Sequence, residues 1–153
     1  GIWRYAVSTD REWSLVEEVL KGNRPAFLMI NMIEYVFGVW DDLVDGDKIH
    51  TKDTINKAFT LVFCELPRNA FYATWQRELQ PLIEYSIWSW LAANEFEKGS
   101  EELKVRAHVM RCEMLNIVIA CARLIGGIDW AIESAAKLRA AIPAETLPEY
   151  LKE

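Results

Sequence analysis

The sequence predicts an all-α fold, a single compact bundle of about seven helices over residues 1–153. No segment alternates polar and apolar residues as a strand would, and apolar residues recur at helical spacing between Pro and Gly residues that divide the chain. A chain of 153 residues is long enough for one domain with its own core. With 52% apolar and 26% charged residues, it does not have the composition of a disordered chain.

The first two helices are predicted from their end signals. Thr9 and Glu12 form a capping-box pattern for a helix over about 10–21. A second helix is expected over about 25–45, because a proline opens its first turn and Gly46 stands where a left-handed cap residue is favoured.

The remaining helices are delimited in the same way. Pro81 is expected to end one helix and open the next, and Ser100 and Asp129 are expected to cap the last two. We find no internal repeat and no linker, so all segments belong to one domain. The helices are expected over 52–66, 69–80, 81–98, 101–125 and 130–142.

Charge, hydropathy and cysteine content narrow the functional class. The net charge is −6 and basic residues do not cluster, so we expect no nucleic-acid binding. The longest apolar run, 26–40, is too short for a bilayer and contains Asn31 and Glu34, so we expect no membrane span. Three cysteines without metal-ligand spacing are typical of buried, reduced thiols in a cytoplasmic protein. These are Cys64, Cys112 and Cys121.

Two helices carry polar residues on a single stripe within otherwise apolar sequence. A buried carboxylate needs a partner, so we expect these groups to line a functional cleft or to pair with Arg111 or Arg123. In the second helix the stripe consists of Asn31, Glu34, Gly38, Asp41 and Asp45. In the helix expected over 101–125 it consists of Glu113, Asn116, Ala120 and Arg123.

An acidic motif ends the second helix. Four carboxylates occur within seven residues, at the helix end where the macrodipole disfavours negative charge. A bound cation would reverse that effect, and hard oxygen ligands suit Mg²⁺ bridging to a phosphate. Asp41, Asp42 and Asp45 are therefore predicted metal ligands, and Asp47 is the fourth carboxylate of the motif. A calcium-binding EF-hand loop is excluded because Leu43 and Lys52 occupy ligand positions.

The string Asp-Asp-Leu-Val-Asp at 41–45 resembles the aspartate-rich motif of class I terpenoid (isoprenoid) synthases. The resemblance implies an all-α, terpenoid-synthase-like fold in which Mg²⁺ grips the diphosphate of a prenyl substrate. The family's second metal motif is partly matched over 94–102 by Asn94, Glu95 and Glu102. Lys98 stands at the serine position of that motif, and Gly99 is expected to break the helix before Glu102.

Tryptophan is abundant, with seven residues in the chain. Trp40 directly precedes the acidic motif and Trp88 precedes Asn94, so both are candidates to line an aromatic pocket beside the acids. Trp88 and Trp90 are two residues apart and cannot share one helix face. One of the two is expected on the surface or at an interface, which favours an oligomer or a protein partner.

Three functions fit these observations. The first is a Mg²⁺-dependent, diphosphate-binding protein with lyase or transferase activity on a prenyl-type substrate. The second is a non-enzymatic interaction or assembly protein, such as a small phage or regulatory factor. The third is a helical nucleoside-triphosphate pyrophosphatase, in which Glu34, Asp41 and Asp45 would face Glu113 across the bundle.

Overall fold

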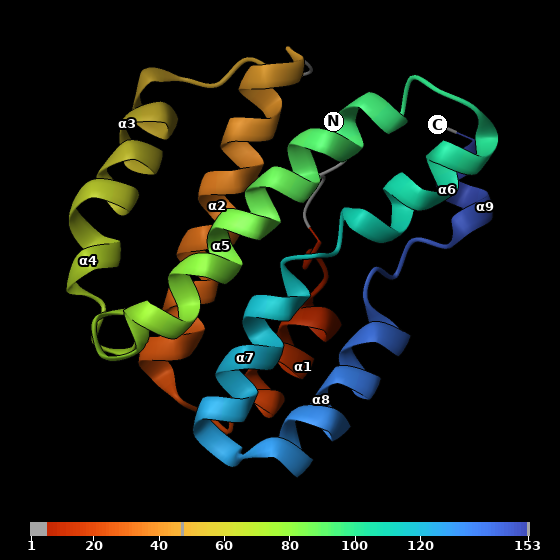
Figure 1. Cartoon of the computed structure of the whole chain (residues 1–153). Coiled ribbons are helices and arrows are strands. Elements are labelled where there is room, and N and C mark those ends of the chain that lie inside the picture. Colours follow the sequence, from red (N-terminus) through yellow and green to blue (C-terminus); the bar gives the residue numbers. More distant parts are fainter. Residues whose placement is uncertain (1–5, 47, 153) are drawn as a thin grey trace.

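The computed structural model describes residues 6–46 and 48–152, and every regular element in these ranges is helical. The prediction of an all-α chain is confirmed (Figure 1). In chain order the elements are α1 (Asp10–Val19), α2 (Arg24–Asp45), α3 (Lys52–Thr60), the π-helical turn η1 (Leu61–Glu65), α4 (Leu66–Arg68), α5 (Ala70–Phe96), α6 (Glu101–Met110), α7 (Leu115–Gly126), α8 (Ile128–Ala141) and α9 (Leu147–Leu151).

Several helix ends have the caps that the sequence predicts. The Thr9 hydroxyl accepts a hydrogen bond from the Glu12 amide at 3.1 Å, and the Glu12 carboxylate accepts one from the Thr9 amide at 2.9 Å. Gly46 ends α2 with φ of 69°, a left-handed conformation that a residue without Cβ adopts at little cost. The Ser100 side chain caps α6 through the amide of Leu103.

The predicted helix boundary at Pro81 is wrong. Pro81 lies inside α5, which spans Ala70 to Phe96 and is interrupted by a kink at Trp75, where φ is −113° and ψ is 22°. A proline inside a helix removes one backbone hydrogen bond and bends the helix, but it does not end the helix when the flanking residues still pack. Leu79 and Ile83, on either side of Pro81, are both buried.

The single long helix expected over 101–125 is also wrong. The structure divides it into α6 and α7, with a turn over 111–114 between them. Within that turn the buried Arg111 forms an ion pair with Glu145, and Arg139 donates a hydrogen bond to the Cys112 carbonyl at 3.3 Å. These long-range contacts favour the change of direction. They also position α9, which the sequence does not predict.

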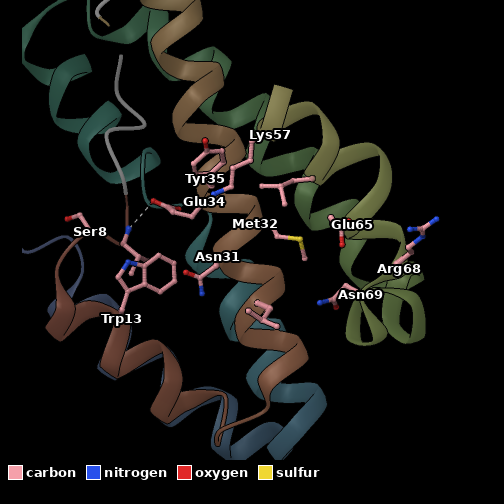
Figure 2. Close-up of a pocket in the computed structure, with 13 residues that line it drawn as sticks. Ser8, Trp13, Asn31, Met32, Glu34, Tyr35, Lys57, Glu65, Arg68 and Asn69 are labelled. Carbon is pink, nitrogen blue, oxygen red and sulfur yellow. Dashed lines mark hydrogen bonds between the residues drawn. The ribbon is translucent and has the colours of Figure 1, made fainter. Parts of the chain in front are cut away.

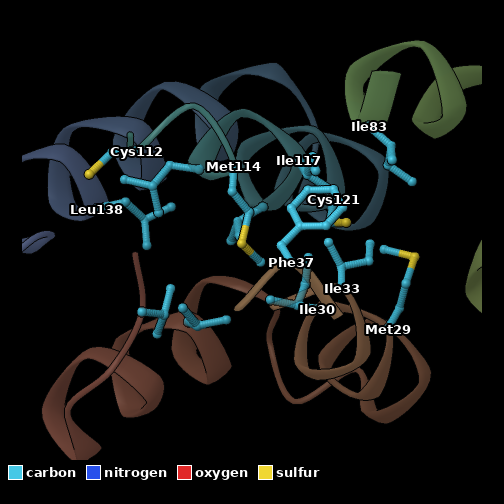
Figure 3. Packing of buried hydrophobic residues seen from close by; sticks show 14 of the residues in the cluster. Met29, Ile30, Ile33, Phe37, Ile83, Cys112, Met114, Ile117, Cys121 and Leu138 are labelled. Atoms are coloured by element: carbon cyan, nitrogen blue, oxygen red, sulfur yellow. The ribbon is translucent and has the colours of Figure 1, made fainter. Parts of the chain in front are cut away.

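The core lies between α2 and α7, with contributions from α1, α5 and α8. Figure 3 shows side chains of α2, among them Ile30, Ile33 and Phe37, pointing toward Met114 and Ile117. Met114, Leu115 and Ile117 are fully buried, and each such side chain contributes about 1.5–3 kcal/mol of transfer free energy. The predicted burial of Cys112 and Cys121 is confirmed, whereas Cys64 is exposed, contrary to prediction.

Helices α2 and α5 run side by side in the same direction. Near their starts, Asn69 donates a hydrogen bond to the Pro25 carbonyl at 2.9 Å. Near their ends, the Trp90 indole donates one to Asp41 at 3.1 Å. The C-terminal ends of the two helices, which carry the two predicted metal motifs, therefore lie on the same side of the molecule.

Helix α3, the turn η1 and α4 form one continuous arm at the edge of the molecule, beside α2 (Figure 1). The arm packs against α2 and against the start of α5. None of the helices within the described ranges combines the length and the apolar character needed to cross a bilayer.

Candidate functional site

The first two carboxylates of the acidic motif at the end of α2 contact different side chains. Asp41 is 2% exposed, and its Oδ1 accepts a hydrogen bond from Trp90 Nε1 at 3.1 Å. Asp42 Oδ2 lies 2.8 Å from Nε2 of His50, a partner that sequence reasoning missed. Asp45 is exposed, and Asp47 lies outside the described residues.

This conformation does not fit a Mg²⁺ site built from the three aspartates. Among residues 6–46 and 48–152, no group of three or more His, Cys, Asp or Glu side chains is placed to hold a metal ion. Asp41 faces an indole and Asp42 faces an imidazole, so both would have to change partners before they shared a cation. Metal binding by Asp41, Asp42 and Asp45 stays a prediction.

The second predicted motif is divided between two helices. Asn94 and Glu95 lie in the last turn of α5, whereas Glu102 lies in the first turn of α6, beyond the break expected at Gly99. Glu95 and Glu102 are exposed and form local ion pairs, Glu95 with Lys98 at 3.4 Å and Glu102 with Arg106 at 3.0 Å. The oxygen of the Asn94 amide is buried and has no hydrogen-bond partner among the described residues.

The structure places residues of the two polar stripes in different contacts. Glu113 accepts a hydrogen bond from Asn116 Nδ2 at 2.7 Å, and Asn116 Oδ1 accepts one from Arg139 at 2.9 Å, which ties α7 to α8. Asn31 and Glu34 line a groove beside α2. The facing of Glu34 and Glu113 across the bundle stays a prediction, and Arg111, one of the two expected arginine partners, pairs with Glu145.

We call the groove that contains Asn31 and Glu34 the polar groove. It crosses the surface of α2, between the start of α1 and the arm formed by α3, η1 and α4, and has a volume of about 730 Å³ (Figure 2). It is lined by Val7, Ser8, Trp13, Leu28, Asn31, Met32, Glu34, Tyr35, Lys57, Leu61, Glu65, Arg68 and Asn69.

Glu34 is the most perturbed group in the polar groove. Its side chain is 3% exposed, Oε1 accepts a hydrogen bond from the Val7 amide at 3.2 Å, and Oε2 is buried with no hydrogen-bond partner among the described residues. Burial raises the pKa of Glu34 to about 8; the charge of nearby Glu12 raises it further, while the Val7 hydrogen bond lowers it. The carboxyl group is therefore mainly protonated at neutral pH.

A second cavity, the apolar groove, lies between α2, the arm and α5 and has a volume of about 610 Å³. Its polar lining residues are Tyr72 and Gln80, and the tyrosine hydroxyl donates a hydrogen bond of 2.6 Å to Gln80 Oε1. It shares Met32 and Leu61 with the polar groove. The lining is Met32, Ile33, Val36, Phe37, Val39, Trp40, Leu43, Ala58, Phe59, Leu61, Val62, Phe63, Leu66, Pro67, Tyr72, Gln80, Ile83 and Ile87.

The structure separates the two tryptophans that are predicted to line an aromatic pocket. Trp40 lines the apolar groove, and its ring packs edge-on against the fully buried Trp90, with 5.0 Å between the ring centroids. Trp88 lines neither groove; it is 56% exposed and packs on Tyr85. The expectation that Trp88 and Trp90 face opposite ways is confirmed, and Trp90 is the member that lies beside the acidic motif.

The acidic motif follows directly on the α2 residues that line the end of the apolar groove. Trp40, which precedes the motif, lines the groove, and Trp90, which donates to Asp41, packs edge-on against Trp40. Asp41, Asp42 and Asp45 are not themselves among the residues that line the groove.

A buried polar cluster holds α9 against α6 and the end of α5. Arg111 lies 2.8 Å from Glu145 and over the ring of Tyr150, whose hydroxyl donates to Glu97 at 3.3 Å. His108 packs on the same tyrosine ring at 4.8 Å between centroids, and burial lowers its pKa. Sequence reasoning missed this cluster because its members come from distant segments without a motif.

The chain matches no protein-family model, no curated protein and no solved structure.

Proposed function

We propose that the protein binds an elongated non-polar small molecule, of the size and character of a prenyl chain, in the apolar groove. The observation that carries this proposal is the groove's lining: about 610 Å³ of concave space with apolar walls, in which the polar residues Tyr72 and Gln80 are hydrogen-bonded to each other. A non-polar ligand that enters such a groove removes apolar surface from water and leaves this hydrogen bond in place.

The volume is appropriate for a ligand of this class. Small-molecule sites occupy about 300–1,000 Å³ and are mostly apolar. Micromolar affinity for a 15-carbon chain corresponds to about 0.5 kcal/mol per carbon, within the range of about 0.3–1.5 kcal/mol per atom for real ligands. Aromatic rings from Phe37, Trp40, Phe59 and Phe63 contribute broad contact surfaces.

The proposal is one of binding and does not include catalysis. The carboxylates that would ionise a prenyl diphosphate through Mg²⁺ do not line the apolar groove, and Asp41 and Asp42 already contact Trp90 and His50. Mg²⁺-dependent chemistry on a diphosphate, as a lyase, a transferase or a nucleoside-triphosphate pyrophosphatase, stays a separate hypothesis.

The exposure of the groove walls favours a second candidate, an interaction protein. Phe59 is 58% exposed and Phe63 is 73% exposed, and their rings stack on each other at the rim of the groove. Exposed apolar surface beside a groove with helical walls is typical of sites that bind an amphipathic helix of a partner. Oligomer formation through this surface is likewise a prediction.

Titration with farnesol, a prenyl alcohol without a diphosphate, tests the first candidate. We expect a micromolar Kd for the wild-type protein by calorimetry. Val62→Lys places a charge on the groove wall, where Val62 is 39% exposed, and should weaken binding at least tenfold. The matched control is Val109→Lys on α6, because Val109 is 60% exposed and lines neither groove.

Equal farnesol binding by both lysine variants would contradict the proposed site, and absence of binding to the wild-type protein would contradict the proposed function. The interaction candidate makes a different prediction. A partner protein that binds the wild-type and Val109→Lys proteins should not bind Val62→Lys, whether or not farnesol binds.

A further inference from the structure

The polar groove combines a buried carboxyl group with apolar and aromatic walls, and it is distinct from the site proposed above. We propose that it is a second small-molecule site, for a compact ligand with an aromatic or aliphatic body and an uncharged hydrogen-bond acceptor. The carboxyl group of Glu34 donates a hydrogen bond to this acceptor, which is a carbonyl oxygen or an unprotonated ring nitrogen.

One carboxyl oxygen of Glu34 has a hydrogen-bond partner and the other has none among the described residues. Oε1 is engaged by the Val7 amide at 3.2 Å, while Oε2 is buried without a hydrogen-bond partner among the described residues. A buried polar atom without a partner is unfavourable, and side chains that line a cavity in this state often mark binding sites. Because Glu34 lines the groove, a small movement of the neighbouring side chains that uncovers Oε2 lets a molecule seated there supply the second hydrogen bond.

The carboxyl group of Glu34 is mainly protonated at neutral pH. Burial raises the pKa of Glu34 to about 8, so at neutral pH Oε1 acts as the carbonyl that Val7 needs and Oε2 carries the proton. A protonated carboxyl group donates, and the matching ligand group is an acceptor.

The charged and titratable groups around Glu34 come from α1, from the turn between α6 and α7 and from the arm. Glu12, from α1, raises the pKa of Glu34 through its negative charge. Cys112, between α6 and α7, has its pKa raised to about 11, mainly by burial, with Glu34 contributing, so it is a neutral thiol. The other charged groups that line the groove come from the arm and are Lys57, Glu65 and Arg68.

Aromatic and aliphatic side chains of the polar groove offer a contact surface to the body of the ligand. Figure 2 shows Trp13 on one side of the groove and Met32 on the surface of α2 between Glu34 and the arm. The Trp13 ring is held edge-on against Phe27, with 5.8 Å between centroids. Lys57 is held over the ring of Tyr35 at 4.5 Å. Polar recognition at Glu34 is thus flanked by aromatic and aliphatic contact surface.

Three probes of nearly equal size test the proposal by NMR on the ¹⁵N-labelled protein. Acetophenone carries a carbonyl acceptor, ethylbenzene lacks it, and benzylammonium replaces it with a cation. The reporters are the Val7 amide, which donates to Glu34, and the Trp13 indole. At pH 6.5 we expect acetophenone to shift both signals saturably, with at least tenfold tighter binding than either other probe.

Two variants and a change of pH identify Glu34 as the receiving group. Glu34→Gln keeps a donor and an acceptor, so it should bind acetophenone as the wild-type protein does, whereas Glu34→Leu should not bind it. Between pH 6.5 and 9.5 the wild-type affinity should fall about 30-fold, following the protonated fraction for a pKa of about 8, and that of Glu34→Gln should stay constant.

Absence of saturable shifts at Val7 and Trp13 with acetophenone would overturn the proposal. Tighter binding of benzylammonium, together with its loss in Glu34→Gln, would also overturn it, because the groove would then select cations. If Glu34→Leu does not fold, the acetophenone affinities of the wild-type and Glu34→Gln proteins as a function of pH still test the proposal. Equal pH dependence of the two affinities would refute the role of Glu34.

Discussion

Replacing Glu34 by Gln should stabilise the protein, and the gain should grow with pH. In the folded protein the pKa of Glu34 is raised from 4.5 to about 8 by burial. Gln has the shape of the protonated acid, and it can accept the Val7 hydrogen bond without ever becoming charged. The variant therefore removes the cost of an ionisable group in the core.

The sign follows from proton binding. Between pH 4.5 and 8 the folded state holds a proton on Glu34 that the unfolded state has lost, so wild-type stability falls as the pH rises through this range. The contribution is fully present below pH 4.5 and fully lost above about pH 8. At 1.36 kcal/mol per pKa unit, the stabilisation of Glu34→Gln is about 3 kcal/mol at pH 7 and about 5 kcal/mol at pH 9.

Urea denaturation at pH 4, 7 and 9 measures this difference. The control is Glu17→Gln, an exposed position on α1, which should change the free energy of unfolding by less than about 0.5 kcal/mol at each pH. A Glu34→Gln variant that is no more stable than the wild-type protein at pH 9 would refute the reasoning. A difference that does not vary with pH would do the same.

Three further predictions concern the acidic motif and the helix contacts. Asp41→Ala should lower the free energy of unfolding by about 1–3 kcal/mol, because it removes the carboxylate that accepts the hydrogen bond of the Trp90 indole. Asp41→Asn keeps an acceptor and should lower the free energy of unfolding by less, and chemical denaturation compares the two variants. Because Asp41 and Asp42 contact different side chains, Mg²⁺ with pyrophosphate should leave the Tm of the wild-type protein and of Asp41→Asn unchanged. A rise in Tm for the wild-type protein but not for Asp41→Asn would instead show that the motif binds Mg²⁺. Gly126→Ala should destabilise by about 1–3 kcal/mol, since its Cβ would lie 2.4 Å from the ring of Trp130, which is hydrogen-bonded to the Val19 carbonyl; thermal denaturation would show the loss.

Local signals predict much of the fold. The capping box at Thr9 and Glu12 and the left-handed Gly46 act within one turn of chain, so their effect is visible in the sequence. The split at 111–114 and the helix α9 depend on Arg111 meeting Glu145, a contact between distant segments that no local pattern announces. Pro81 misleads because a proline is compatible with a bent helix when its neighbours are buried.

The candidate site is predictable to a similar degree. Helical spacing places Asn31 and Glu34 on one stripe, and both line the polar groove. The same spacing groups Asp41 and Asp45 with them, but tertiary packing buries Asp41 against Trp90 and leaves Asp45 exposed. Periodicity gives the face of a helix on which a side chain lies, and only the packing of other helices decides what that face meets.

The sequence does not predict the apolar groove, because its walls come from three segments that are separate in the chain: α2, the arm and α5. Its members resemble ordinary core residues in the sequence, and Trp40 is the lining residue that the motif analysis selects. No pattern in the sequence indicates that the arm stands away from α2 far enough to leave a cavity.

The most direct test of the proposed function is the location of bound farnesol. With ¹³C-labelled isoleucine methyl groups, intermolecular nuclear Overhauser effects should connect the ligand to Ile83 and Ile87, which line the apolar groove. Ile132, 66% exposed on α8 and outside both grooves, should show none. Contacts to Ile132 but not to Ile83 and Ile87, or no contacts at saturating ligand, would contradict the account.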